Sequence, residues 1–369
     1  MTLGSATADW YARAAVELAA TSELQFAWAR GVAGDAELLA LIDELPREHR
    51  QPSLLFAVAA WWGAPAVAYP HWRDFVVANW HAIGPAAALR RTQTNEVGRC
   101  IPLLLGLSTF DGPIALIELG AAAGLCLALD RYEYRFDGGP VVSSTPGPGA
   151  PLIEAFTSGA PRSTHSACFG ERAMGQSQSQ SQSQSLNQSQ SLTRMPEIAW
   201  RAGVDLAPLD VRDPDDVRWL EALLPPDRPA RRARLRAAIG AVLADPPRVV
   251  AGDALGSLPV LAAEARAAAP HATLVVASLG TAVYLPPADR AALPDAVAAL
   301  GAHLVAFEPV AALPGNRECL ARLPAPEDTP FLLSVGGEPV AFASAHGDRL
   351  AWLSDASPAR QPRLPDSAT

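Results

Sequence analysis

The chain has 369 residues, of which 49% are hydrophobic and 18% charged, and its formal net charge is −9. This length and apolar content predict a globular protein of one large domain or two ordinary ones. The acidic balance disfavours nucleic acid and anionic membranes as partners, because both need a concentrated positive surface. The sequence contains no lysine, which excludes a pyridoxal Schiff base, a lysine-dependent aldolase, a Walker-type phosphate loop and a protein kinase.

Cysteine and histidine spacing argues against disulfides and metal sites. The four cysteines lie far apart without a C-x-x-C pair, and the seven histidines are scattered without metal-ligand spacing. The longest uncharged stretch, residues 51–72, is interrupted by prolines, and the N-terminus carries no signal-peptide pattern. A G-x-S-x-G motif is also absent, which disfavours a serine hydrolase. We therefore expect a cytoplasmic protein with reduced thiols and no metal.

The first hundred residues are predicted to be helical. Between residues 9 and 107 apolar residues recur at helical spacing, and prolines and glycines separate the segments. The character changes at Ile114, where a short apolar run of strand length is followed by glycine and a second helical pattern through Tyr132. We therefore place a helical N-terminal cap region at residues 1–110 and a Rossmann-like α/β domain at residues 111–369.

Residues 136–194 interrupt the predicted α/β domain. They show little apolar periodicity and end in the tract QSQSQSQSQSLNQSQS at 176–191, whose small apolar surface cannot offset the entropy of ordering. We expect this Gln/Ser-rich segment to be a flexible insertion that is looped out of the domain.

After residue 195 strand and helix patterns alternate, as expected for a mostly parallel sheet covered by helices on both faces. The predicted strands are 199–206, 248–251, 273–277 and 303–307, and the predicted helices are 217–224, 231–243, 258–268 and 287–300. The runs at 331–335, 339–343 and 350–353 predict an antiparallel hairpin that completes the sheet.

The segment LIELGAAAGL at residues 116–125 has the pattern of a strand, a glycine-bearing turn and the start of a helix. Gly120 and Gly124 permit a tight turn and a close ligand approach, and the first N–H groups of the helix would offer donors. Ala122 stands where the usual G-x-G-x-G pattern has its middle glycine. The pattern indicates either a nucleotide-type cofactor site or a purely structural strand-to-helix turn.

Two acidic residues follow later predicted strands. Asp205 ends the second strand and Asp253 comes just after the third, where carboxylates accept hydrogen bonds from a ribose or an adenine. With Glu118, Gly120 and Gly124, this order resembles class I S-adenosylmethionine-dependent methyltransferases. The resemblance implies that the glycine turn supports the methionine and ribose portion, that Asp205 binds the ribose hydroxyls and that Asp253 lies by the adenine.

The sequence departs from that pattern in its spacing as well as at Ala122. About 80 residues, rather than some 20, separate Gly124 from Asp205. This spacing requires the insertion to be looped out, and it leaves Asp130 or Glu133 as alternative ribose acids.

Over nearly its full length the chain also resembles the bacterial family called domain of unknown function 2332. The resemblance is carried by RRTQTNEVGR at 90–99, IELGAAAGL at 117–125, EIAWRAGVDLAPLDV at 197–211 and HGDRLAWL at 346–353. It implies a fold but no established reaction.

The first of these motifs is unusually polar for a segment next to the apolar residues 102–107. Its side chains could bind a substrate carboxylate or amine, with Glu96 as the base and with Arg91, Thr94, Asn95 and Arg99 as ligands. The alternative interpretation is an ion-paired helix that connects the two predicted regions.

Three further candidates follow the fourth and fifth predicted strands. Ser278 comes directly after the fourth strand and would contact the cofactor, and Tyr284 lies in the same loop as a possible acid or packing residue. Glu308 ends the fifth strand, where a carboxylate faces the same cleft or accepts structural hydrogen bonds.

Together these patterns predict an S-adenosylmethionine-dependent, methyltransferase-like enzyme that acts on a small polar metabolite beneath the helical N-terminal region. Methyl transfer depends more on alignment than on acid–base chemistry, so positioning residues suffice. Two alternatives remain. One is a non-methylating enzyme of secondary metabolism, for example an eliminase or a cyclase on the same fold. The other is a non-catalytic binding protein with a protein partner.

Overall fold

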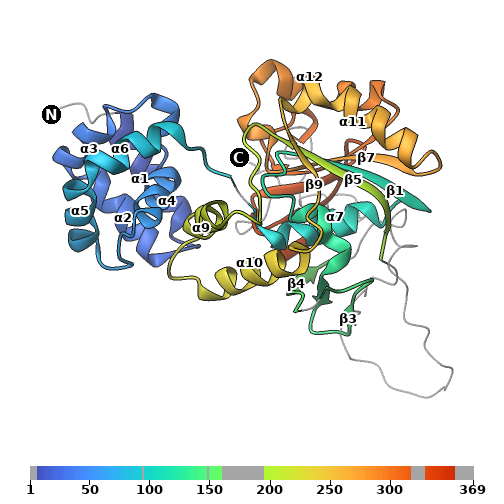
Figure 1. The fold of residues 1–369 in the computed structure, drawn as a ribbon, viewed down its shortest axis with the longest axis horizontal. Coiled ribbons are helices and arrows are strands. Elements are labelled where there is room, and N and C mark those ends of the chain that lie inside the picture. The colour runs from blue at the N-terminus through green and yellow to red at the C-terminus, as the bar shows by residue number, and fades with distance from the viewer. Residues whose placement is uncertain (1–5, 94, 148, 160–194, 317–328, 354–369) are drawn as a thin grey trace, which may run out of the picture. The chain divides into compact units, whose positions relative to one another are not determined.

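The computed structural model describes residues 6–93, 95–147, 149–159, 195–316 and 329–353 (Figure 1). The chain divides into two compact units. The helical unit comprises residues 1–95 and 209–239, and the sheet unit comprises residues 96–208 and 240–369. This division differs from the predicted boundary at residue 110, since residues 96–110 belong to the sheet unit and residues 209–239 to the helical unit.

The helical unit buries an aromatic core. Its elements are α1 (Ala6–Leu18), α2 (Glu23–Ala33), α3 (Ala36–Ile42), η1 (Arg47–His49), α4 (Pro52–Trp61), α5 (Tyr69–Ala78), α6 (Trp80–Leu89), α9 (Pro214–Ala222) and the first part of α10 (Pro229–Val242). The rings of Trp28 and Trp72 stack with centroids 4.9 Å apart, and Phe56 meets both edge-on. Such contacts between large buried rings stabilise the core beyond the burial of their area.

Residues 209–239 join the helical unit because their apolar side chains belong to its core. Trp219 in α9 is 1% exposed within that core, and the guanidinium of Arg90 lies over the rings of both Trp61 and Trp219. Local periodicity correctly predicts a helix here. Whether this helix joins the helical unit or the sheet unit depends on which apolar surface covers Trp219. The periodicity of the sequence does not indicate that surface.

The sheet unit contains 11 described strands in the order β3-β2-β4-β11-β10-β9-β8-β7-β1-β5-β6. The strands are β1 (Pro113–Leu119), β2 (Glu133–Phe136), β3 (Val141–Val142), β4 (Leu152–Ser158), β5 (Glu197–Asp205), β6 (Val249–Ala251), β7 (Thr273–Leu279), β8 (His303–Pro309), β9 (Phe331–Val335), β10 (Glu338–Ala343) and β11 (Arg349–Trp352). Strands β6, β5, β1, β7 and β8 are mutually parallel, while β9 and β10 form the predicted antiparallel hairpin. The expectation of a mostly parallel α/β sheet is thereby confirmed.

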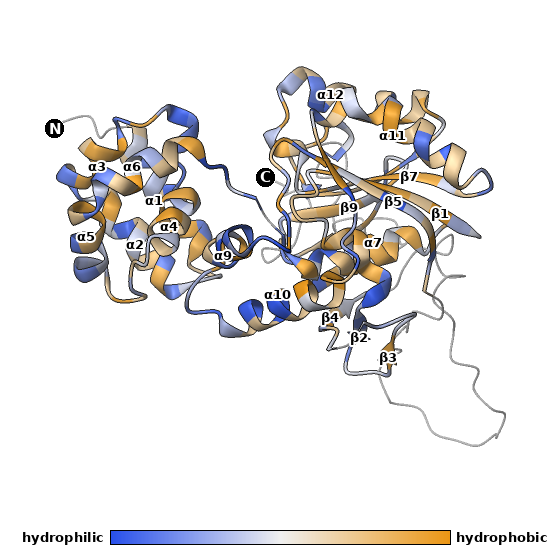
Figure 2. Cartoon of the chain, in the orientation of Figure 1, coloured by the Kyte–Doolittle hydropathy of each residue, from blue (hydrophilic) through white to orange (hydrophobic). Residues whose placement is uncertain are grey.

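Helices cover both faces of the central strands. On one face, α11 (Ala254–Ala268) and α12 (Pro287–Ala299) pack against alternate strand residues such as Ile117, Val276 and Ala306. On the other face, α7 (Cys100–Leu107) is buried along its whole length and is mostly hydrophobic (Figure 2). The near-continuous burial of β1, β7 and β8 follows from this double coverage.

The predicted insertion is partly ordered in the sheet. Strand β4 lies between β2 and β11 and runs parallel to both, and its residues alternate between buried and exposed positions. Ile153 and Ala155 supply the buried face, so this short segment does have apolar surface to bury. The expectation of a flexible insertion therefore does not hold for residues 136–159, and the Gln/Ser tract at 176–191 lies outside the described residues.

Among the described helices, none is both long and apolar enough to cross a membrane. Within the same ranges, no group of three or more His, Cys, Asp or Glu side chains could hold a metal ion.

Candidate functional site

The winding of the sheet reverses between two central strands. From β1 the chain proceeds outward to β5 and β6, and then returns to the opposite side of β1 for β7 and β8. Ligands of doubly wound sheets bind outside the carboxyl ends of the strands at such a reversal. We call this region the carboxyl edge, meaning the last residues of the parallel strands and the segments that follow them.

The turn after β1 has a left-handed backbone at three positions. Gly120 and Gly124 have φ angles of +66° and +72°, and Ala122 has a φ angle of +50°. Glycine adopts this conformation without strain, whereas an alanine there costs about 1–2 kcal/mol. The turn thus has the shape of a three-glycine turn, although its middle position is alanine.

Hydrogen bonds within the protein occupy most N–H groups of this turn. Gly120 and Ala121 donate to the carbonyl oxygen of Val204, at 2.8 and 3.1 Å, and Gly124 donates to Ala121 at 2.7 Å. The N–H of Ala122 donates to Oδ2 of Asp205 at 2.9 Å. The Asp205 carboxylate therefore holds the strained residue from the neighbouring strand.

The expected helix after the turn is a short 3₁₀ segment. η3 (Cys126–Arg131) has six residues and is interrupted at Ala128, whose φ and ψ of −94° and 25° are not helical. The prediction of an α-helix through Tyr132 is therefore wrong, and the turn lacks the aligned N–H groups of an α-helix N-terminus. The reason is that side chains from distant strands hold this segment in place, so the apolar periodicity reflects burial instead of an α-helix.

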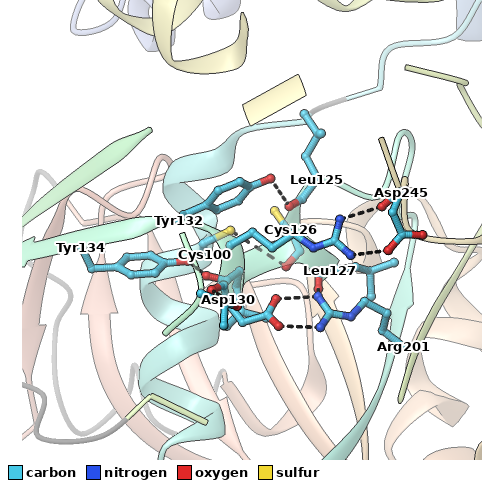
Figure 3. Close-up of polar contacts among 12 residues, drawn as sticks. Cys100, Leu125, Cys126, Leu127, Asp130, Tyr132, Tyr134, Arg201 and Asp245 are labelled. Atoms are coloured by element: carbon cyan, nitrogen blue, oxygen red, sulfur yellow. Dashed lines mark hydrogen bonds and ion pairs between the residues drawn. The ribbon is translucent and has the colours of Figure 1, made fainter. Parts of the chain in front are cut away.

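Figure 3 shows the contacts that hold η3. Arg201 in β5 binds both carboxylate oxygens of Asp130 at 2.5 and 2.6 Å and also donates to the carbonyl of Leu127. Tyr132 donates its hydroxyl to the carbonyl of Leu125, and Arg131 pairs with Asp245 at 2.8 Å. Asp130 is thus ion-paired through both oxygens with the largely buried Arg201, and this pair holds η3 against β5.

The two strand-end aspartates differ in their surroundings. Asp205 is partly buried, and its Oδ1 accepts a hydrogen bond from the N–H of Ala207 at 2.9 Å. Asp253 is exposed and caps α11, because its Oδ1 accepts from the N–H of Gly256 at 2.7 Å. Both lie at the carboxyl edge as predicted, and each has a structural function beside any contact with a ligand.

Glu308 is completely buried at the end of β8. Its Oε1 accepts hydrogen bonds from the hydroxyl of Ser278 at 2.6 Å and from the N–H groups of Thr281 and Ala282 at 2.9 and 3.0 Å. Its Oε2 is buried and has no hydrogen-bond partner among the described residues. Burial raises the pKa of Glu308, although these three hydrogen bonds and the nearby Arg99 oppose the shift. Ser278 contacts Glu308 and is itself fully buried.

Glu118 at the end of β1 is a second buried carboxyl group. It is 4% exposed, and its Oε2 likewise has no hydrogen-bond partner among the described residues. Burial raises the pKa of Glu118 well above its ordinary value, and Cys126 and Asp205 act in the same direction. Such a carboxyl group keeps its proton at a pH where exposed carboxylates have lost theirs.

Arg99 is a largely buried cation at the carboxyl edge. It is 9% exposed, and it donates to the carbonyl of Leu279 at 2.5 Å and to that of Ala345 at 3.3 Å. Gly280 makes room for it, since a Cβ on Gly280 would lie 2.9 Å from the guanidinium carbon. Its positive charge lowers the pKa of both Glu118 and Glu308, which places all three groups within electrostatic reach of one another.

Glu96 pairs with a histidine that the sequence patterns did not select. Its Oε1 accepts from the N–H of Gly98 at 3.1 Å, and its Oε2 lies 3.8 Å from Nδ1 of His346. Glu96 is 3% exposed, and the side chain of His346 is 29% exposed. The available signal was that RRTQTNEVGR and HGDRLAWL both carry the family resemblance, but nothing in the sequence places one against the other.

The remaining predicted residues are placed as follows. The side chain of Tyr284, in η4 (Ala282–Tyr284), is 63% exposed, which fits neither an oriented catalytic acid nor a packed core residue. Arg91 and Asn95 belong to the helical unit, and Thr94 lies outside the described residues.

Comparison with known proteins gives a family without an assigned activity. A family model described as "Uncharacterized protein conserved in bacteria (DUF2332)" matches residues 8–352. No curated protein and no solved structure matches the chain.

Proposed function

Since the chain belongs to the bacterial family DUF2332, whose description gives no activity, we propose a function from the site itself. We propose that the sheet unit binds S-adenosylmethionine at its carboxyl edge and that the protein is a methyltransferase-like enzyme acting on a small polar metabolite. The observation that carries the proposal is the strained turn at residues 120–124, which lies at the winding reversal and is held by Asp205.

The charge of the carboxyl edge favours a cationic cofactor. Carboxyl groups at or beside this edge include those of Glu96, Glu118, Asp205, Asp253 and Glu308, with Arg99 near them. Burial raises the pKa of Glu118 and Glu308, so the charge argument rests on the less buried Asp205 and Asp253. S-adenosylmethionine carries a positive sulfonium and no phosphate, so these two carboxylates attract it. A dinucleotide carries a pyrophosphate, which the same edge repels.

The hydrogen bonding of the turn supports the same choice. Phosphate sites on parallel sheets use unoccupied N–H groups of the turn and the N-terminus of the following helix. In this chain four N–H groups between residues 120 and 124 are engaged within the protein, and a short 3₁₀ segment follows them. A cofactor without phosphate does not need those donors.

The residues at the edge define how such a cofactor would be held. Asp205 keeps the turn in place, and its carboxylate oxygens can each accept a second hydrogen bond, in this case from ribose hydroxyls. The exposed Asp253 is available to the adenine amino group, and Gly120 and Gly124 let the methionine portion approach the backbone. The cofactor would supply an electrophilic methyl group, and the protein would align the acceptor with it.

A second reaction class is favoured by the two buried carboxyl groups. Methyl transfer has little use for a carboxylic acid that stays protonated, whereas an elimination or a ring closure needs a general acid. The raised pKa values of Glu118 and Glu308 fit that role. An enzyme of this class would use the same edge without consuming a methyl donor.

Calorimetric titration of the full chain with S-adenosylhomocysteine tests the proposal. We expect binding that Asp205→Asn weakens at least about tenfold, because a neutral amide accepts the ribose hydroxyls less strongly. The control Glu338→Gln changes an exposed acid at the start of β10, at the end of the strand that lies away from the carboxyl edge. This variant should leave the affinity unchanged. Circular dichroism of both variants verifies that they are folded.

Two results would reject the methyl-donor proposal. One is no heat of binding at protein concentrations far above those of ordinary cofactor sites. The other is displacement of S-adenosylhomocysteine by NAD, which would mean that the edge accepts a pyrophosphate after all.

A further inference from the structure

Two segments almost 250 residues apart in the chain meet at the carboxyl edge. They are residues 96–99, which lead into α7, and residues 344–348, which connect β10 to β11. A Cβ on Gly98 would overlap the carbonyl oxygen of His346, and one on Gly347 would overlap that of Gly98. Arg99 adds a hydrogen bond to the carbonyl of Ala345 at 3.3 Å. The backbones therefore touch closely, and glycine at both positions permits it.

The strand register places the second segment at the same edge as the acids. β10 is antiparallel to β9, which is antiparallel to β8, so β10 runs in the direction of the central parallel strands. Ala343 aligns with Phe331, which aligns with Pro309. The turn that carries His346 therefore follows β10 at the level where β8 ends with Glu308.

Backbone and side-chain bonds fix this turn. Gly347 donates to the carbonyl of Ser344 at 3.0 Å, and Ser344 donates to that of Arg349 at 2.9 Å. The hydroxyl of Ser344 also donates to the carboxylate of Asp348. These bonds fix the backbone that carries His346, which is one requirement for a positioned catalytic group.

Glu96 is the group that aligns the ring. Its Oε2 lies 3.8 Å from the buried Nδ1 of His346, which is within ion-pairing distance but longer than a hydrogen bond. Catalytic pairs without substrate are often this long. Its backbone carbonyl accepts from the thiol of Cys126 at 3.7 Å, which ties it to the segment after the glycine turn. The carboxylate of the pair is thus buried, while the side chain of His346 is partly exposed.

We infer that His346 is the proton acceptor of the carboxyl edge, positioned by Glu96. This inference rests on the proposed function, which defines the reaction that His346 would serve. The N–H or O–H group of the substrate that accepts the methyl group transfers its proton to Nε2 of His346. The electron pair of the broken bond stays on the nucleophilic nitrogen or oxygen of the substrate. The imidazole becomes an imidazolium, and Glu96 balances its charge.

The pairing predicts one tautomer and one direction of coupling. With Nδ1–H directed at Glu96, the neutral ring carries its lone pair on Nε2. The other charged or titratable groups beside the pair are Arg99, Asp348 and the Cys126 thiol, whose pKa the Cys100 hydrogen bond and burial raise. Removing the Glu96 charge should therefore lower the pKa of His346.

Nuclear magnetic resonance of the histidine ring nitrogens in the full chain tests this directly. The signals of His346 are identified by their loss in His346→Gln, and a pH titration is recorded for wild type, Glu96→Gln and the control Glu338→Gln. We expect Nδ1–H in the neutral wild-type ring and a pKa that falls by about one unit in Glu96→Gln only. The glutamine can still accept from the N–H of Gly98, so the local turn is retained.

Two outcomes would overturn the inference: an Nε2–H tautomer in wild type, or an equal pKa of His346 in wild type and Glu96→Gln. Addition of S-adenosylhomocysteine to the same samples separates the two proposals. A shift of the His346 signals supports both. Absence of binding rejects the methyl donor, while the measured pairing still supports His346 as the base of another reaction.

Discussion

Replacing Ala122 with glycine should change the stability of the protein very little, although Ala122 is 1% exposed. Three effects combine. Loss of the buried methyl group costs about 0.8 kcal/mol. The greater freedom of glycine in the unfolded chain costs about 0.4–1 kcal/mol. Relief of the left-handed alanine, whose φ is +50°, gains about 1–2 kcal/mol, so the sum is close to zero.

Ala123 provides a matched control in the same turn. Ala123 is 3% exposed and does not have a positive φ angle. Ala123→Gly therefore loses a buried methyl group and gains freedom in the unfolded chain, but it relieves no backbone strain. We expect Ala123→Gly to lower the free energy of unfolding by about 1–2 kcal/mol more than Ala122→Gly does.

Urea unfolding followed by circular dichroism measures this difference in the free energy of unfolding. The comparison requires that wild type, Ala122→Gly and Ala123→Gly have equal m values, the slopes of that free energy against urea concentration. Equal losses in the two variants would mean that the turn stores no strain at Ala122. The description of residues 120–124 as a three-glycine turn with one alanine would then be refuted.

Two further predictions concern buried charge. Asp130→Asn should lower the free energy of unfolding by about 2–3 kcal/mol, because it leaves the largely buried Arg201 without its carboxylate. The control Asp245→Asn changes a side chain that is 85% exposed and should lower it by at most about 1 kcal/mol. Similar losses for the two variants in urea unfolding would contradict this account. Burial raises the folded pKa of Glu118, so its contribution to stability is complete below the ordinary pKa and is lost as the pH rises through the folded pKa. Glu118→Gln does not titrate, so its urea midpoint should rise relative to wild type across that window, and parallel curves for the two proteins would exclude the shift.

Much of the fold was predictable from the sequence, because local patterns determine secondary structure. The alternation after residue 195 gave each later strand and helix of the sheet unit to within a few residues, and the hairpin around residues 336–337 was also correctly predicted. Apolar runs and turn residues act over short distances along the chain, so the sequence contains these signals directly.

The site could be predicted only in part. The sequence placed Glu118, Asp205 and Glu308 at strand ends, and the parallel sheet does bring strand ends to one edge. It could not show that Asp130 is ion-paired with Arg201, because Arg201 lies on β5, 71 residues further along the chain, and meets η3 only in the folded sheet unit.

What only the tertiary structure decided concerns groups that are distant in sequence. Sequence alone determined most strands and helices after residue 195 and the bacterial family to which the chain belongs. The topology of the sheet then brought His346 to Glu96, and the packing of α9 on the other helices made Trp219 part of the helical core. Pairing across 250 residues depends on register and on which apolar faces cover one another, and neither quantity is contained in the local pattern of residues.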